Sequence, residues 1–181
     1  MFSASCRPCE NAQIWSKCFA NLNIQNLELF KNQILVFAFG EIDVRCHIGK
    51  QRDINERDLD EIIETLAINY INRILLNQWQ YMPLLCIVYS VIPPTDICFN
   101  PDFPFYGTIE DRIMISKKLN ARLAALCSQV KIEFLDVYDE YANLDGTLNT
   151  QYSDGCVHIN PTCYPAIALK LINILLKNKI I

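Results

Sequence analysis

The sequence predicts a three-layer α/β/α sandwich built on a flavodoxin-like parallel sheet. Three short segments, at residues 33–39, 84–91 and 131–137, are predicted to be strands, and the first two are apolar runs typical of strands buried on both faces. Longer segments with apolar residues at helical spacing alternate with these predicted strands. Strands that alternate with helices imply right-handed crossovers, and therefore a parallel sheet covered on both sides.

The first predicted helix lies between the first two strands. Asn55 is expected to cap it, with Asp58 in its first turn beside the positive end of the helix dipole. Apolar residues then recur every three or four positions from Leu59 to Leu75. The second strand leads into a loop rich in proline and aromatic residues over 92–107. This loop could form an apolar wall for an acyl group, or it could pack as an ordinary loop.

Two further helices complete the alternation. Thr108 with Asp111 resembles a capping box and predicts a helix start. Asn160 followed by Pro161 predicts the last helix, because proline is favoured at the first helical position. The buried face expected for this helix holds Ile167, Ala168, Leu171, Ile174 and Leu175.

Length and composition indicate one folded domain. The chain has 181 residues, of which 51% are hydrophobic and 20% charged, so residues 1–181 are expected to form a single domain with residues 1–32 as an atypical N-terminal segment. A formal net charge of −4 lacks the basic field that phosphate backbones attract, so no nucleic-acid partner is expected. Lys170, Asn173 and Lys177 interrupt the most apolar segment, so we expect no membrane span.

Cysteine usage bears on the compartment. The chain has 9 cysteines, an odd number, and its N-terminus lacks the basic stretch and apolar run of a signal peptide. We therefore expect a cytoplasmic protein whose cysteines act mostly as small apolar residues.

Cys6 and Cys9 form a Cys-x-x-Cys pair that could be a redox motif or half of a zinc site. The absence of a preceding strand and of a second such pair favours incidental cysteines.

Ligands of open parallel sheets bind beyond the carboxyl ends of the strands, and polar residues follow the first strand directly. Glu41, Asp43 and Arg45 alternate along what is expected to be the end of this strand. They could orient a substrate or brace a catalytic loop, or they could form a local ion pair where the strand leaves the core.

A second polar segment is expected on the same edge, ahead of the last helix. Asp154 stands four positions before His158. A carboxylate that accepts the imidazole N–H fixes its tautomer and stabilises the imidazolium formed on proton uptake. The two residues could therefore be a catalytic pair, or a helix-entry aspartate and a half-exposed histidine.

Two segments carry a resemblance to the SGNH (GDSL-type) hydrolases. Residues 153–160 (SDGCVHIN) resemble the family's last motif, in which an Asp and a His complete a Ser-His-Asp triad. Residues 39–45 (FGEIDVR) resemble its third motif, Gly-x-Asn-Asp, at the end of the middle strand. The resemblance implies a carboxylic-ester hydrolase without cofactor or metal, acting on a small ester or an acylated glycan. In it, His158 is the general base, Asp154 orients it, and Gly40 and Asp43 shape the oxyanion end.

The chain departs from the family pattern in three ways. The first motif, Gly-Asp-Ser after the first strand, is absent. Ile42 occupies the place of the oxyanion-binding Asn, and the Asp-to-His spacing is one residue longer than usual. These departures predict either a hydrolase truncated at its N-terminal strands or a non-catalytic relative that binds a ligand or partner through the same edge. Missing strands would leave residues 34–39 as an uncovered edge, which residues 1–32, a homo-oligomer or another chain would cover.

One metal arrangement is an alternative. Cys46, His47, Cys156 and His158 could converge on a zinc ion, because both segments are expected on one edge. The adjacent Cys46 and His47 would point in divergent directions, which favours a site without metal.

Overall fold

The structure, a computed structural model, describes residues 33–97 and 104–181. Three strands form a parallel sheet in the order β1-β2-β3: β1 (Ile34–Ala38), β2 (Leu85–Tyr89) and β3 (Glu133–Leu135). Ile34 pairs with Leu85, and Ile87 pairs with Glu133. The three predicted segments of the sequence thus form the expected strands, and the parallel sheet is confirmed.

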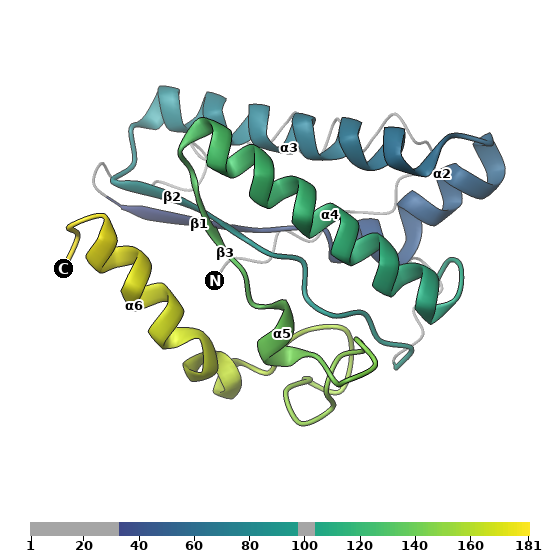
Figure 1. Cartoon of the computed structure of the whole chain (residues 1–181). Helices are drawn as coiled ribbons and strands as arrows, with labels where there is room; N and C mark the ends of the chain where they lie inside the picture. The colour runs from purple at the N-terminus through teal and green to yellow at the C-terminus, as the bar shows by residue number, and fades with distance from the viewer. Residues whose placement is uncertain (1–32, 98–103) are drawn as a thin grey trace.

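Helices cover both faces of this sheet (Figure 1). On one face α3 (Leu59–Tyr81) and α4 (Ile109–Val130) pack over Phe37, Cys86 and Val88. On the other face α6 (Ala168–Lys177) packs over Ile87 and Tyr89. The central strand, β2, therefore contributes alternate side chains to two separate apolar cores, which is why its sequence is apolar throughout.

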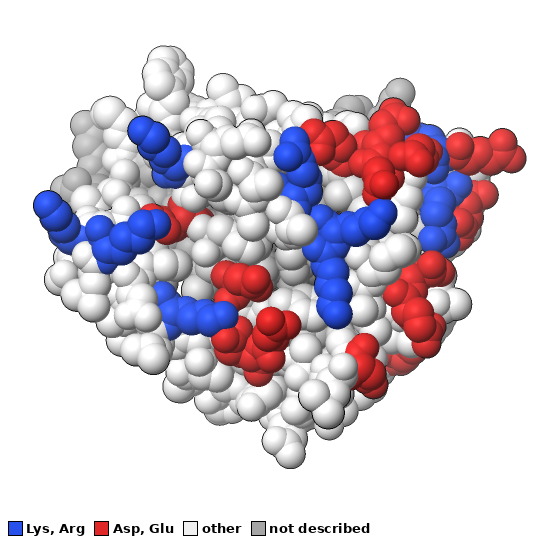
Figure 2. Space-filling view, in the orientation of Figure 1, with Lys and Arg blue, Asp and Glu red and all other residues white. Residues whose placement is uncertain are grey.

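Charged side chains join the two helices of the first face. Lys118 Nζ lies 2.6 Å from Asp60 Oδ1, and Arg122 pairs with Glu64 one helical turn further along. Figure 2 shows basic and acidic side chains side by side over this face, without a continuous basic surface. Such exposed pairs each contribute only ~0–1 kcal/mol, so they align the helices more than they stabilise the fold.

The helix starts were predicted with mixed success. Thr108 and Asp111 form a capping box, because each side chain accepts a hydrogen bond from the other residue's backbone N–H. The start predicted at Asn55 is wrong, since Asn55 is the last residue of a separate helix, α2 (Ile48–Asn55). Asp58 is the cap of α3 and accepts a hydrogen bond of 2.9 Å from Glu61 N. A left-handed backbone at Glu56 separates the two helices, and nothing in local propensity marked that break.

The C-terminal part begins with the short helix α5 (Tyr138–Tyr141). After a long loop, Asn160 caps a 3-10 helix, η4 (Pro161–Ile167), by accepting a hydrogen bond from Thr162 N. The helix α6 follows directly. Its expected buried face is only partly right: Ile167 is buried, whereas no residue of α6 itself is fully buried and Ala168 is exposed. The reason is that α6 touches the sheet with one side only.

Cysteines play more than one role. Cys46, Cys86 and Cys127 are free and buried, as expected of small apolar residues. Cys156 differs, because it is disulfide-bonded. Cys6 and Cys9 lie outside the described residues.

The edge predicted to be uncovered is apolar and open to solvent in part. Val36 of β1 exposes 45% of its surface. The expectations of truncated N-terminal strands and of a segment that covers this edge fall on residues 1–32, outside the described residues. Within the described ranges, no helix combines the length and the hydrophobicity needed to cross a membrane.

Candidate functional site

Gly40 ends the extended segment of β1 and turns the chain into a helix. Its φ is +115°, a backbone conformation that favours glycine. A Cβ at this position would lie 2.5 Å from Val91 Cγ2, at the end of β2. Both observations require glycine here, so the turn that starts the candidate site depends on the absence of a side chain.

The residues after Gly40 are helical, which corrects the expectation that they continue a strand. Residues 41 and 42 are helical, and a π-helix, η3 (Asp43–His47), leads into α2. The alternation of Glu41, Asp43 and Arg45 had suggested an extended chain. Packing of η3 against α4 explains the outcome, because it buries Val44 and Cys46 in a helical geometry.

Glu41 and Arg45 form an ion pair one helical turn apart. Arg45 Nε lies 2.8 Å from Glu41 Oε1, and its Nη2 donates a hydrogen bond of 3.1 Å to Oε2. The Glu41 side chain keeps 26% of its surface exposed, whereas that of Arg45 keeps 8%. Burial raises the pKa of Glu41 despite the lowering effect of Arg45. The pair therefore presents a partly desolvated carboxylate at the carboxyl end of β1.

Asp43 does not face the same way. It is only 3% exposed, and its Oδ1 has no hydrogen-bond partner within the described residues. Burial, reinforced by the nearby Glu41 charge, raises its pKa well above the ordinary value. Its charge would also raise the pKa of the buried Tyr70. The structure thus places Asp43 in the interior beneath the site.

The loop that carries Asp154 and His158 brings these two side chains into contact. His158 Nδ1 lies 3.3 Å from Asp154 Oδ2. Asp154 Oδ1 accepts hydrogen bonds from the backbone N–H groups of Cys156 and His158, at 2.8 and 3.3 Å. Because Asp154 N also donates to His158 O, the carboxylate is held on several sides. This contact orients the imidazole with its Nε2 away from Asp154.

The two halves of the candidate site are linked by charge. His158 is exposed over 66% of its side chain, and its charge lowers the pKa of Glu41. This electrostatic influence joins segments that stand more than one hundred residues apart in sequence. Arg112 acts on Glu41 in the same sense. The candidate site therefore consists of two side-chain pairs, Glu41–Arg45 directly after β1 and Asp154–His158 in the loop before η4.

A third pair was missed by sequence reasoning. Arg112, in the first turn of α4, is only 1% exposed and pairs with Asp96 of the loop after β2. Its guanidinium also donates a hydrogen bond of 3.0 Å to Gly107 O and lies 4.8 Å from the centre of the Phe105 ring. An arginine just after a capping box was the available signal. These contacts tie Asp96, which follows β2, to the start of α4.

Three serine hydroxyls of the described ranges form hydrogen bonds with the backbone. Ser90 Oγ accepts a hydrogen bond from Val137 N, and Ser153 Oγ donates one to Cys156 O. Ser116 Oγ donates to Ile113 O. Within residues 33–97 and 104–181, the His158 ring has Asp154 as its hydrogen-bond partner and no serine hydroxyl.

A zinc site at this edge finds no support in the described part of the chain. No group of three histidine, cysteine or acidic side chains there could hold a metal ion. The Cys46 side chain is buried in the interior, and the Cys156 sulfur is engaged in a disulfide.

Comparison with known proteins concerns the fold. No protein-family model matches the chain, and no curated protein matches it in sequence. Among solved structures, a GDSL-like lipase from Bacteroides thetaiotaomicron aligns with 90% of this chain and 97% of its own, at 16% identity and a TM-score of 0.54. A candidate platelet activating factor from Streptococcus pneumonia aligns with 90% of this chain and 92% of its own, at 12% identity and a TM-score of 0.54. The chain therefore has an α/β fold like that of a GDSL-type lipase.

Proposed function

We propose that this chain is an SGNH-like carboxylic-ester hydrolase that acts on a small ester or on an acyl group of a glycan. His158 is the general base and Asp154 the carboxylate that orients it. The observation that carries the proposal is the contact between these two side chains. We assign the pair to the edge of the sheet where open parallel folds bind ligands. The lipase-like fold supports the same reading but leaves the chemistry to the site.

The proposed reaction needs one proton to move twice. His158 Nε2 takes a proton from an attacking hydroxyl group, whose oxygen bonds to the ester carbonyl carbon. The imidazolium, stabilised by Asp154, then returns the proton to the leaving alcohol as the carbon–oxygen bond breaks. The attacking group is water, which gives the acid directly, or a hydroxyl from outside the described residues. In the second case the hydroxyl oxygen keeps the acyl group until water, deprotonated by His158 in the same way, attacks the new ester, and the proton returns to the hydroxyl as the acid leaves.

Glu41 and Arg45 complete the proposed site on its other side. Glu41 keeps an exposed carboxylate edge that can accept a hydrogen bond from the substrate. Gly40 and Asp43 shape the oxyanion end from beneath, because the one has no side chain and the other is buried.

The experiment compares turnover of a chromogenic acetate ester by the wild type, His158→Ala and Asp154→Asn. General-base catalysis predicts a loss of ~10²–10⁴-fold for His158→Ala and a smaller loss for Asp154→Asn. Circular dichroism should show unchanged folding, because the imidazole is largely exposed. Equal turnover by all three proteins would contradict the proposal.

A second candidate is a non-catalytic module that binds a ligand or partner through the same edge. The observation in its favour is that, in the described ranges, the His158 ring has no serine hydroxyl partner. Wild-type turnover no higher than that of His158→Ala would select this candidate.

A further inference from the structure

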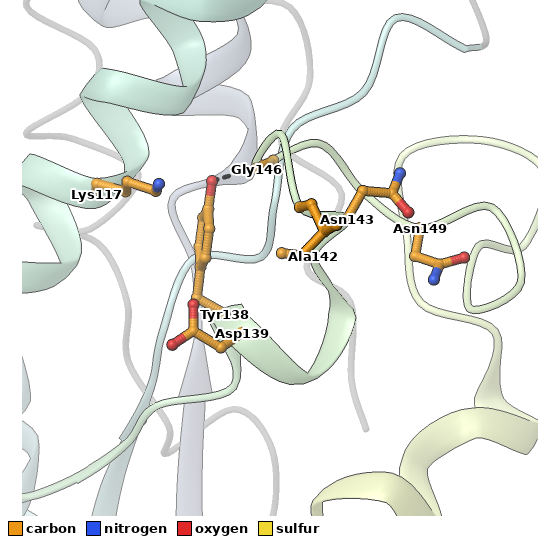
Figure 3. Close-up of a pocket in the computed structure, with 8 residues that line it drawn as sticks. Lys117, Tyr138, Asp139, Ala142, Asn143, Gly146 and Asn149 are labelled. Carbon is orange, nitrogen blue, oxygen red and sulfur yellow. Dashed lines mark hydrogen bonds between the residues drawn. The ribbon is translucent and has the colours of Figure 1, made fainter.

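A depression of about 470 Å³ lies between α4, α5 and the loop that follows α5 (Figure 3). Its volume falls within the ~300–1,000 Å³ typical of small-molecule sites. The side chains that matter for its chemistry are Lys117, Tyr138, Asp139, Asn143, Leu144 and Asn149. The depression uses none of the residues placed in the hydrolase site.

The walls of this depression are held in place before any ligand arrives. Tyr138 is buried, and its hydroxyl donates a hydrogen bond of 2.8 Å to Gly146 O. Asn143 N donates to Thr147 O at 2.8 Å, and an isolated bridge joins Ala142 to Leu148. A preformed wall lowers the ordering cost of binding.

Two opposite charges line the depression without neutralising each other. Lys117 Nζ lies 5.7 Å from the centre of the Tyr138 ring, in the arrangement visible in Figure 3. Within the described residues, Lys117 has this ring contact, and neither Lys117 nor Asp139 forms an ion pair or a side-chain hydrogen bond. Both groups are therefore available to a ligand.

The two amides add one acceptor and one donor. Asn143 Nδ2 donates to Thr147 Oγ1 at 3.0 Å, which leaves its Oδ1 available. Asn149 Oδ1 accepts a hydrogen bond of 3.0 Å from Gln151 N, which leaves its Nδ2 available. The set thus offers donors at Lys117 and Asn149 and acceptors at Asp139 and Asn143.

This mixture selects among ligand classes. A phosphate group needs donors and excess positive charge, and a metal cation needs acceptors alone. Here the formal charges of Lys117 and Asp139 cancel, and the depression offers both hydrogen-bond donors and hydrogen-bond acceptors. Hydroxyl groups both donate and accept. The fully exposed Leu144 offers an apolar surface beside them.

We propose that this depression binds a neutral, polyhydroxylated ligand, such as one or two units of a saccharide. The proposal stands independently of the hydrolase function. If both hold, the depression binds the glycan part of a substrate, at a distance from the bond that breaks.

The test is an NMR titration of the full-length, isotope-labelled protein with lactose, cellobiose and diacetylchitobiose. Millimolar saccharide should shift the backbone signals of Gly146 and Asn149. Lys117→Ala and Asp139→Ala should each weaken binding about tenfold, the cost of removing hydrogen bonds to a charged group. Lys118→Ala is the matched control, because Lys118 pairs with Asp60 and does not line the depression.

Three outcomes would overturn the proposal: no shifts with any saccharide, equal binding by Lys117→Ala and Lys118→Ala, or shifts of the same signals by inorganic phosphate or Ca²⁺ instead. His158→Ala should retain saccharide binding. Loss of esterase turnover and loss of saccharide binding are therefore separate results.

Discussion

The burial of His47 makes a quantitative prediction about acid stability. Burial, with the positive charges of Lys50 and Arg45, lowers the pKa of His47 from its ordinary 6.5 to about 4. Between pH 4 and pH 6.5 the imidazole is neutral in the fold and protonated in the unfolded chain. The unfolded state therefore binds more protons in this range. Stability contributed by neutral His47 is therefore complete above pH 6.5 and is lost as the pH falls toward 4.

The magnitude follows from this difference in pKa. At 1.36 kcal/mol for each pKa unit, the fall from 6.5 to about 4 corresponds to about 3 kcal/mol of unfolding free energy lost on acidification. His47 is partly accessible, so solvent screening reduces the expectation to about 2 kcal/mol. In His47→Gln this pH dependence should disappear, because glutamine does not titrate.

The measurement is urea unfolding of the wild type and His47→Gln at about pH 7.5 and about pH 4.5. Burial raises the pKa values of Glu41 and Asp43, but both groups are present in both proteins, so their contribution cancels in the comparison. His158→Gln is the matched control, since the chain has 2 histidines and this one is largely exposed. Parallel pH dependence of the wild type and His47→Gln would refute the reasoning.

Two further predictions concern the turn and the interior beneath the site. Asp43→Asn should stabilise the protein at neutral pH relative to the wild type. As the pH rises above 3.8, the Asp43 carboxyl ionises more readily in the unfolded chain than in the fold, where its pKa is raised, so the wild type loses stability. The gap should close in urea titrations below the ordinary pKa of 3.8, and a constant gap would contradict this account. Gly40→Ala should cost about 2–3 kcal/mol in unfolding free energy, from backbone strain plus the contact with Val91. Gly155→Ala is its control, because φ is +91° there but a Cβ would meet nothing within 4 Å, so equal losses would rule out the steric contribution.

The strands and several helix starts could be predicted because they depend on neighbours in the sequence. Continuous apolar runs suffice to identify strands buried on both faces, and Thr108 with Asp111 carries its own capping geometry. The extended chain predicted at residues 41–45 was wrong because that prediction also relied only on neighbours in the sequence. The alternation of Glu41, Asp43 and Arg45 suits an extended chain locally, and the contact of η3 with α4 outweighs that preference.

The candidate site shows the same division between local pattern and long-range packing. The topology of alternating strands and helices was enough to expect residues near 41 and near 158 on one edge, because parallel strands end together. A sequence pattern does not specify where each side chain points, so it could not show that Glu41 faces outward while Asp43 points inward. Nor could it show the pairing of Arg112 with Asp96 or the open charges of Lys117 and Asp139. These depend on which surfaces meet after folding, and that is set by packing between elements far apart in the chain.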